Sequence, residues 1–364
     1  MGMFLTDLNC IKQREYVNLP EWNKYTGKGL TIFHDDVDVN HSATCVDIIQ
    51  TIHPDAKILE GGFGFYINNN KVEECYIRCN GVRTEFDDFI KDNKIDMINN
   101  STDGGKDNSE SPIAIYMRAK IKEHNLICTG SSGNYGGMTN KFQGAFIMVG
   151  GVYLKGNTVI NTFSDGEAKD FAMFMGFQSG TSFSAPFLNG VIGKLRCRYG
   201  NITQEEVYKY LKFISKHFGE DGHNPQYGWG IPILPELDRK YITMSTNSNE
   251  YYVDGNIKTM DTKPVNLNGN VFVPIRAISE SLGADIKWEP ISRTVLINDT
   301  INLQIGNKEA FVGDKKVILN YAPFIDKNNR TLVPIRFIAE ALNCKVDWVQ
   351  NESKVMILEN TINR

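Results

Sequence analysis

The 364-residue sequence has no apolar run of the roughly 20 residues that a membrane-spanning helix requires. Residues 1–16 contain no apolar core of signal-peptide length, so we expect a protein made in the cytoplasm. The net charge of −4 and the lack of a basic stripe argue against nucleic acid as a partner. The seven cysteines have no paired spacing, which indicates reduced thiols rather than a disulfide framework.

The length of the chain and a change in its composition near residue 238 predict two domains, at residues 1–238 and 239–364. The first domain alternates short apolar runs with amphipathic stretches, a pattern typical of an α/β fold with a doubly wound parallel sheet. Functional groups of such folds gather at the carboxyl ends of the strands. The expected strands are 30–33, 57–59, 95–99 and 126–129, and the expected helices include one from about 41, 86–93 and 113–124.

The second domain is an internal repeat. Residues 271–283 are matched by residues 331–343, and Trp288 and Trp348 occupy equivalent places further along. Each copy is predicted to form a strand, a helix that begins at a proline, and a strand-turn-strand unit. Such a duplication predicts a smaller α+β domain of two similar modules packed on each other.

The segment from Gly180 to Pro186, Gly-Thr-Ser-Phe-Ser-Ala-Pro, opens an apolar helical run and places Ser182 at the helix start. Backbone N–H groups and the helix dipole can stabilise an anion there. Pro186 is compatible with a first helical turn, in which no N–H needs an intrahelical partner. Taken alone, the segment also fits a helix that is merely capped by a serine.

This segment resembles the nucleophile motif of the subtilisin-like serine proteases, and the resemblance extends over about residues 27–236. It implies a triad in the chain order Asp, His, Ser, with His41 as the base and Ser182 as the nucleophile. His34, His53 and His124 lack the setting of His41, between a strand-end carboxylate and an apolar helix. Cys45 matches a cysteine that some family members carry beneath the catalytic histidine.

Two residues compete for the carboxylate of the triad. Counting from the preceding strand without gaps selects Asp36, whereas a shift of one residue selects Asp35. Successive strand residues face opposite sides of a sheet, so only one of the two can point at His41. The family's usual Asp-Ser/Thr-Gly is absent, and the interval to His41 is short.

The resemblance also implies donors for the oxyanion and a wall for the substrate. Asn134 would offer its side-chain amide beside the backbone N–H of Ser182, although Asn134 also fits a plain turn residue. Asp103 could favour a basic substrate residue or be a solvated loop acid. The implied substrate-binding residues are Ser101, Thr102, Asp103, Gly104, Ser131, Ser132 and Gly133.

The repeats of the second domain resemble the copper-amine-oxidase N-terminal-like stalk domain of bacterial surface proteins. The resemblance implies no copper, and residues 239–364 contain no histidine. Arg276 and Arg336 fit either ligand-reading side chains or braces against a neighbouring strand. The stalk suggests cell-wall polymer or a partner protein as its ligand.

Together these features predict a serine endopeptidase that acts on proteins or peptides without a cofactor. Many family members bind structural calcium, but no site can be assigned here. The degraded Asp and His motifs leave an alternative, an inactive scaffold or binding protein targeted by its stalk. The stalk suggests the cell surface, while the missing signal suggests the cytoplasm or a phage-type release at lysis.

Overall fold

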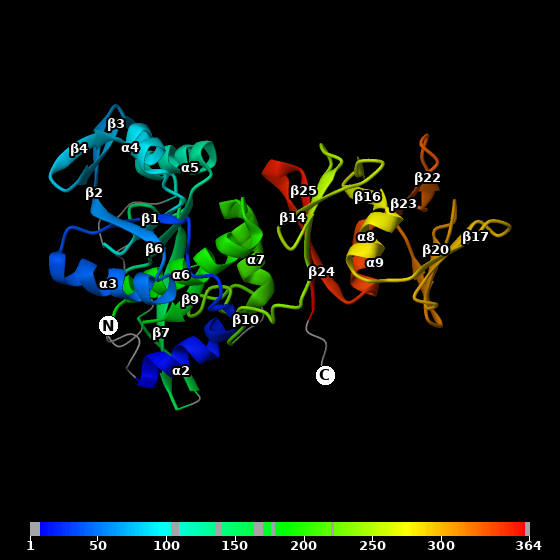
Figure 1. The fold of residues 1–364 in the computed structure, drawn as a ribbon, viewed down its shortest axis with the longest axis horizontal. Coiled ribbons are helices and arrows are strands. Elements are labelled where there is room, and N and C mark those ends of the chain that lie inside the picture. Colours follow the sequence, from blue (N-terminus) through cyan, green and yellow to red (C-terminus); the bar gives the residue numbers. More distant parts are fainter. Residues whose placement is uncertain are drawn as a thin grey trace. The chain divides into compact units, whose positions relative to one another are not determined.

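The computed structural model describes residues 8–102, 109–134, 140–156, 158–163, 170–175, 179–219 and 222–360. The chain divides into two compact units, Met1–Leu237 and Asp238–Arg364 (Figure 1). In the described part, no helix combines the length and the apolar character needed to cross a membrane. All seven cysteines lie among the described residues, and none forms a disulfide.

Unit 1 is built on one sheet with the strand order β4-β3-β2-β1-β5-β6-β7-β8, in which β9 also pairs with β7. The pairs from β2 through β1, β5, β6 and β7 to β9 are parallel. The predicted α/β class with a parallel sheet is therefore confirmed. The elements are α2 (Leu8–Tyr16), η1 (Leu19–Trp22), β1 (Thr31–Asp35), α3 (Val39–Ile52), β2 (Lys57–Asn68), β3 (Lys71–Cys79), β4 (Val82–Glu85), α4 (Phe86–Asn93), β5 (Met97–Asn100), α5 (Pro112–His124), β6 (Ile127–Ser131), β7 (Ile147–Lys155), β8 (Thr158–Phe163), β9 (Phe171–Phe174), α6 (Thr181–Tyr199), α7 (Gln204–Ile214), β10 (Ser215–Lys216) and β11 (Ile231–Pro232).

Helices cover both faces of this sheet, and the alternation along β1 decides which side chain meets which helix. Phe33 points to the face of α4, where its ring lies 5.4 Å from that of Phe89. His34 points to the opposite face, toward α3 and α6. Because the alternation continues past the end of the strand, Asp35 falls on the α4 face and Asp36 on the α3 face.

The strand predicted at 57–59 continues to Asn68 and forms an antiparallel meander with β3 and β4. Three glycines, Gly61, Gly62 and Gly64, interrupt the apolar pattern of this stretch and hide the strand from sequence analysis. A side chain at Gly61 would overlap the carbonyl oxygen of Arg78, and one at Gly64 would overlap the Tyr76 ring. These glycines permit close approach between strands rather than a turn.

Helix α6 starts at Thr181, so Pro186 is its sixth residue and not part of the first turn as expected. Proline has no N–H, and the carbonyl of Ser182 four residues earlier therefore lacks its intrahelical donor. The Cys45 thiol on α3 lies 3.5 Å from that oxygen and donates to it. The neighbouring helix thus compensates for the proline.

The contact between α3 and α6 depends on Gly193, because a Cβ there would overlap the His53 ring. His53 Nε2 donates to the Gly190 carbonyl over 2.8 Å. We expect Gly193→Ala to lower the free energy of unfolding by about 1–3 kcal/mol, the usual cost of overpacking. Urea unfolding measures this, and the same substitution should cost less in a His53→Ala background. Equal costs in both backgrounds would show that His53 is not the obstacle.

Unit 2 contains the predicted duplication. Each copy has a strand, a helix capped by proline and a hairpin. Strands β16 and β23 pair antiparallel, with Val273 opposite its repeat counterpart Val333. The elements are β12 (Tyr241–Ser245), β13 (Glu250–Val253), β14 (Asn256–Thr259), β15 (Val265–Leu267), β16 (Asn270–Pro274), α8 (Ile275–Ser281), β17 (Ile286–Glu289), β18 (Thr294–Ile297), β19 (Ile301–Gln304), β20 (Glu309–Val312), β21 (Lys315–Ile318), β22 (Phe324–Ile325), β23 (Thr331–Pro334), α9 (Ile335–Ala341), β24 (Cys344–Val349), η3 (Gln350–Glu352) and β25 (Lys354–Glu359).

The two copies are interleaved. The hairpin β24–β25 of the second copy completes a five-stranded sheet with β12, β13 and β14, which precede the first copy's helix. In the same way, the hairpin β17–β18 of the first copy completes a five-stranded sheet with β19, β20 and β21. Each of these sheets therefore combines the hairpin of one copy with the three strands that precede the helix of the other copy.

Candidate active site

Asp36 and His41 form the centre of the site, at the carboxyl end of β1. His41 Nδ1 donates to Asp36 Oδ2. Asp38 caps α3, because its Oδ1 accepts from the backbone N–H groups of Asn40 and His41 over 3.0 and 3.1 Å. Asp36 Oδ1 in turn accepts from the Asp38 N–H over 3.0 Å. The short interval between Asp36 and His41 is therefore a compact turn that the Asp38 cap stabilises. The sequence analysis does not predict this cap.

The Asp36 carboxylate is 2% exposed and the His41 side chain is 28% exposed. Burial acts to raise the pKa of Asp36, but hydrogen bonds from His41 and the Asp38 backbone outweigh it and hold that pKa below its usual value. Asp36 is therefore a charged acceptor at neutral pH. Its partner His41 remains accessible from solvent.

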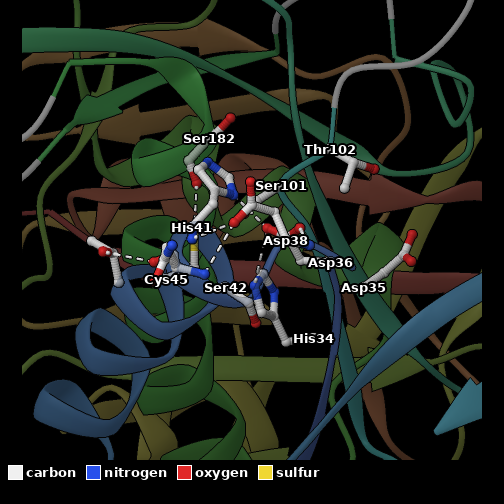
Figure 2. Close-up of polar contacts among 12 residues, drawn as sticks. His34, Asp35, Asp36, Asp38, His41, Ser42, Cys45, Ser101, Thr102 and Ser182 are labelled. Carbon is white, nitrogen blue, oxygen red and sulfur yellow. Dashed lines mark hydrogen bonds and ion pairs between the residues drawn. The ribbon is translucent and has the colours of Figure 1, made fainter. Parts of the chain in front are cut away.

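Asp35 lies on the other face of the sheet. Its Oδ1 accepts from the Phe63 backbone N–H over 3.1 Å, and its Oδ2 accepts from Asn100 Nδ2 over 2.6 Å. Burial raises the pKa of Asp35. Figure 2 shows this side chain pointing away from His41. Of the two candidate carboxylates, Asp36 is the one that contacts the imidazole.

Ser182 is the second residue of α6 and is 6% exposed. Two contacts hold its helical turn against α3. The ring centres of His41 and Phe183 are 5.2 Å apart, and the Cys45 thiol one turn after His41 donates to the Ser182 carbonyl. Figure 2 shows Ser182 beside His41, as expected from these contacts. The structure thus brings Asp36, His41 and Ser182 together.

Asn134 follows β6 and is anchored to the first turn of α6. Its Oδ1 accepts from the Thr181 backbone N–H over 2.8 Å and from the Thr181 hydroxyl over 3.1 Å. The oxygen of the amide is therefore committed to Thr181, so the Nδ2 group is the donor that this side chain offers. The backbone N–H of Ser182 belongs to the same turn, at the second helical position, where an α-helix supplies no intrahelical acceptor.

We expect Asn134→Ala to lower kcat by about 10²–10³-fold with little change in KM, as loss of an oxyanion donor does. Steady-state hydrolysis of a fluorogenic peptide measures the change. Thr181→Val serves as the control, because it removes one of the two donors that hold the amide and should cost less than about tenfold. A large rise in KM with unchanged kcat would instead assign Asn134 to ground-state binding.

The first predicted substrate segment is described only in part. Ser101 is 1% exposed, and its hydroxyl accepts from Asn99 Nδ2 over 2.9 Å. Thr102 is half-buried and accepts from Asn100 Nδ2 over 2.8 Å. Asp103 and Gly104 lie outside the described residues, so the role of Asp103 stays a prediction.

The second predicted segment closes β6. Ser131 and Ser132 are buried, and the Ser132 N–H donates to the Val149 carbonyl over 3.0 Å. Gly133 adopts a φ of 100°, which places the chain in the left-handed region before Asn134. These residues therefore direct Asn134 toward α6. A part for their backbone in substrate binding stays a prediction.

Sequence analysis gives no role to His34, yet this residue lies directly beneath the pair. Its Nε2 is 3.8 Å from Asp36 Oδ2, and burial lowers the pKa of its imidazole to about 4. Its Nδ1 lies 3.0 Å from Asn99 Nδ2, and the oxygen of the same amide accepts from the Thr129 hydroxyl over 3.0 Å. The sequence feature that indicates its role is its position two residues before Asp36, which places both side chains on the same face of β1.

A separate hollow lies in unit 2. Its volume is 590 Å³, and Arg276, Glu280 and Trp288 are among the residues that line it. The Arg276 side chain is 78% exposed and lies 3.7 Å from Glu280, one turn further along α8. Its counterpart Arg336 reaches the Val346 carbonyl on β24 over 3.4 Å. Bracing against a strand therefore fits Arg336 but not Arg276.

Comparison with known proteins identifies a family for the second domain. Residues 233–297 and 252–357 match the family described as copper amine oxidase N-terminal domain, which confirms the resemblance predicted for the repeats. No curated protein matches the chain. Solved structures similar to this chain include subtilisin-like proteases at 11–16% identity.

Three of these neighbours illustrate the likeness. MycP1 from Mycobacterium smegmatis is 14% identical, and the match covers 61% of this chain and 82% of MycP1 with a TM-score of 0.43. Fervidolysin from Fervidobacterium pennivorans is 14% identical, and the match covers 77% of this chain and 57% of fervidolysin with a TM-score of 0.44. A lanthipeptide protease is 14% identical, with coverage of 64% and 95% and a TM-score of 0.40.

Proposed function

We propose that this chain is a serine endopeptidase that hydrolyses protein or peptide substrates through Asp36, His41 and Ser182. The observation that carries the proposal is the hydrogen bond from His41 Nδ1 to the buried Asp36 carboxylate, at the point where α3 contacts the first turn of α6. A buried carboxylate, an accessible imidazole and a helix-start serine are the parts that acyl transfer by serine requires.

In this mechanism the contact with Asp36 determines which imidazole nitrogen carries the proton. Ionised Asp36 can only accept, so His41 Nδ1 must carry a proton and Nε2 presents its lone pair. That lone pair is the base for the Ser182 hydroxyl. The charge of Asp36 then stabilises the imidazolium that forms when Ser182 attacks the peptide carbonyl.

The anion that forms on the carbonyl oxygen would be held by Asn134 Nδ2 and the backbone N–H of Ser182. His41 then protonates the leaving amine, which releases the first product and leaves an acyl group on Ser182. Water, deprotonated by His41, attacks this ester and restores the serine. A hollow of 670 Å³ lies beside Asp36, and the exposed Val37 and Val39 are among the residues that line it.

Covalent labelling by a fluorophosphonate tests the proposal, because the reagent reacts with an activated serine hydroxyl. We expect one adduct per chain, located on Ser182 by mass spectrometry of a digest, and none in His41→Ala. Folding of each variant is checked by circular dichroism. A folded wild-type chain that takes no label would contradict the proposal and favour the inactive scaffold.

A further inference from the structure

Three metal-ligating side chains meet beneath the Asp36–His41 pair. They are His34 from β1, Asp36 from the following turn and Cys45 from α3, and their ligand atoms all lie within 4.8 Å of one another. All three residues are buried, with exposures of 0%, 5% and 0%. Imidazole, carboxylate and thiolate together are a ligand set typical of zinc rather than of calcium or magnesium.

The imidazole of His34 supplies a second, independent observation. Its Nε2 is fully buried and has no hydrogen-bond partner among the described residues, and it faces the Asp36 carboxylate. Its Nδ1 lies 3.3 Å from the Asn99 backbone carbonyl and 3.0 Å from Asn99 Nδ2. Metal binding through Nε2 selects the tautomer with the proton on Nδ1, which then donates to the Asn99 carbonyl, while Asn99 Nδ2 keeps its bond to the Ser101 hydroxyl. Metal-bound histidines commonly donate their other ring N–H to a backbone carbonyl in this way.

A second group of possible ligands, Asp87, Glu123 and His124, differs from this cluster because a lysine contacts its two carboxylates. Lys120 Nζ lies 2.6 Å from Asp87 and 2.9 Å from Glu123, so its ammonium already neutralises these carboxylates. The buried cluster has no such cation next to His34 among the described residues. This second group therefore serves as a control rather than as a rival site.

We propose that His34, Asp36 and Cys45 bind a borderline-soft divalent cation, such as Zn²⁺, and that the bound ion blocks the Asp36–His41 pair. A tetrahedral zinc site places its ligand atoms about 3.5 Å apart, so no separation within this cluster has to close by more than about 1.3 Å. The pair formed by His34 and Asp36 is already at 3.8 Å. A water molecule on the side of His41 would complete the coordination.

Binding changes the protonation of one ligand. The Cys45 thiol releases its proton to solvent and binds as thiolate, while neutral His34 and ionised Asp36 bind as they are. Cys45 also gives up its weak bond to the Ser182 carbonyl.

The block follows from competition for one atom. Asp36 Oδ2 is both the acceptor of His41 Nδ1 and the oxygen nearest to His34 Nε2. An ion on this oxygen draws the carboxylate away from His41, which then loses its orienting partner. The partly exposed His41 side chain separates the cluster from solvent, so rotation of this side chain would let the ion enter from solvent. This inhibitory consequence rests on the proposed function, whereas metal binding itself does not.

Co²⁺ titration of the full chain tests binding, because a cobalt–thiolate bond absorbs in the near ultraviolet and tetrahedral cobalt absorbs in the visible. We expect both absorptions with one equivalent of Co²⁺, and their loss when Zn²⁺ is added. Cys45→Ala and His34→Leu should lose the ultraviolet and the visible signals respectively. His124→Gln, in the second group, should retain both. No absorption in wild type, or full absorption in Cys45→Ala, would overturn the site.

The inhibitory part is measured as the rate of fluorophosphonate labelling with and without Zn²⁺. Wild type should label at least about 100-fold more slowly when zinc is bound, by analogy with loss of a triad carboxylate. The ratio for Cys45→Ala should stay close to one. Equal slowing of both proteins would overturn the block. Cobalt absorption in a chain that never labels would leave the metal site standing and refute only the protease proposal.

Discussion

Replacement of Ser182 by alanine is expected to reduce kcat by roughly 10⁶-fold, to the detection limit of a fluorogenic casein assay. In the proposed mechanism this hydroxyl forms the acyl intermediate, and no other group is assigned that role. Substrate contacts elsewhere remain, so binding measured with an unreactive peptide should change little. The variant should also take no fluorophosphonate label.

Ser184 provides a matched control on the same helix. Its hydroxyl is buried and donates to the Met173 carbonyl over 3.0 Å, so it is bound within the fold. Ser184→Ala should leave kcat within a few-fold and lower the free energy of unfolding by about 1 kcal/mol. Hydrolysis that survives in Ser182→Ala would assign the activity to another group and contradict the proposed function.

Asp36→Asn is expected to lower kcat by about 10⁴-fold without loss of the fold. The asparagine amide can donate to His41 Nδ1, which moves the imidazole proton to Nε2. His41 then faces Ser182 with a proton instead of a lone pair and cannot act as the base. Kinetics with a fluorogenic peptide measures the loss, and a thermal melt checks that the variant is folded.

The neighbouring substitution Asp35→Asn separates this effect from a general loss of charge. Burial already favours the neutral form of Asp35, and Asn100 holds the side chain on the opposite face of the sheet. Asp35→Asn should therefore keep kcat within about tenfold of wild type, since it leaves the charge beside His41 in place. The reverse order of effects would mean that Asp35 serves the site.

The sequence predicts those helices and strands whose positions follow from their own pattern of apolar residues. Helix α4 is predicted at its observed bounds, Phe86–Asn93, because apolar side chains recur on one face of this stretch. The sheet strands β1, β5 and β6 are predicted within two residues of their ends. The meander from β2 to β4 is not predicted, because the glycines that let its strands approach look like turn residues in a single sequence.

At the candidate site, the sequence predicts Asp36 or Asp35, His41 and Ser182 but not the contacts between them. The choice between Asp35 and Asp36 depends on where β1 ends, and one residue reverses the face. The place of Pro186 in the second turn of α6 depends on the Cys45 thiol, which is remote in the chain. The sequence does not identify His34, because the neighbours of a single histidine in a strand can be predicted only when the sheet face that it occupies is known.

The interleaving of the two repeats sets the order in which unit 2 can be completed during synthesis. Strand β12 leaves the ribosome first, but its partner β25 is the last strand of the unit. Such a long loop closes slowly, so the nascent unit carries an unpaired strand edge until translation is nearly finished. A chain cut short before Lys354 keeps that edge and is expected to aggregate rather than to yield one working repeat.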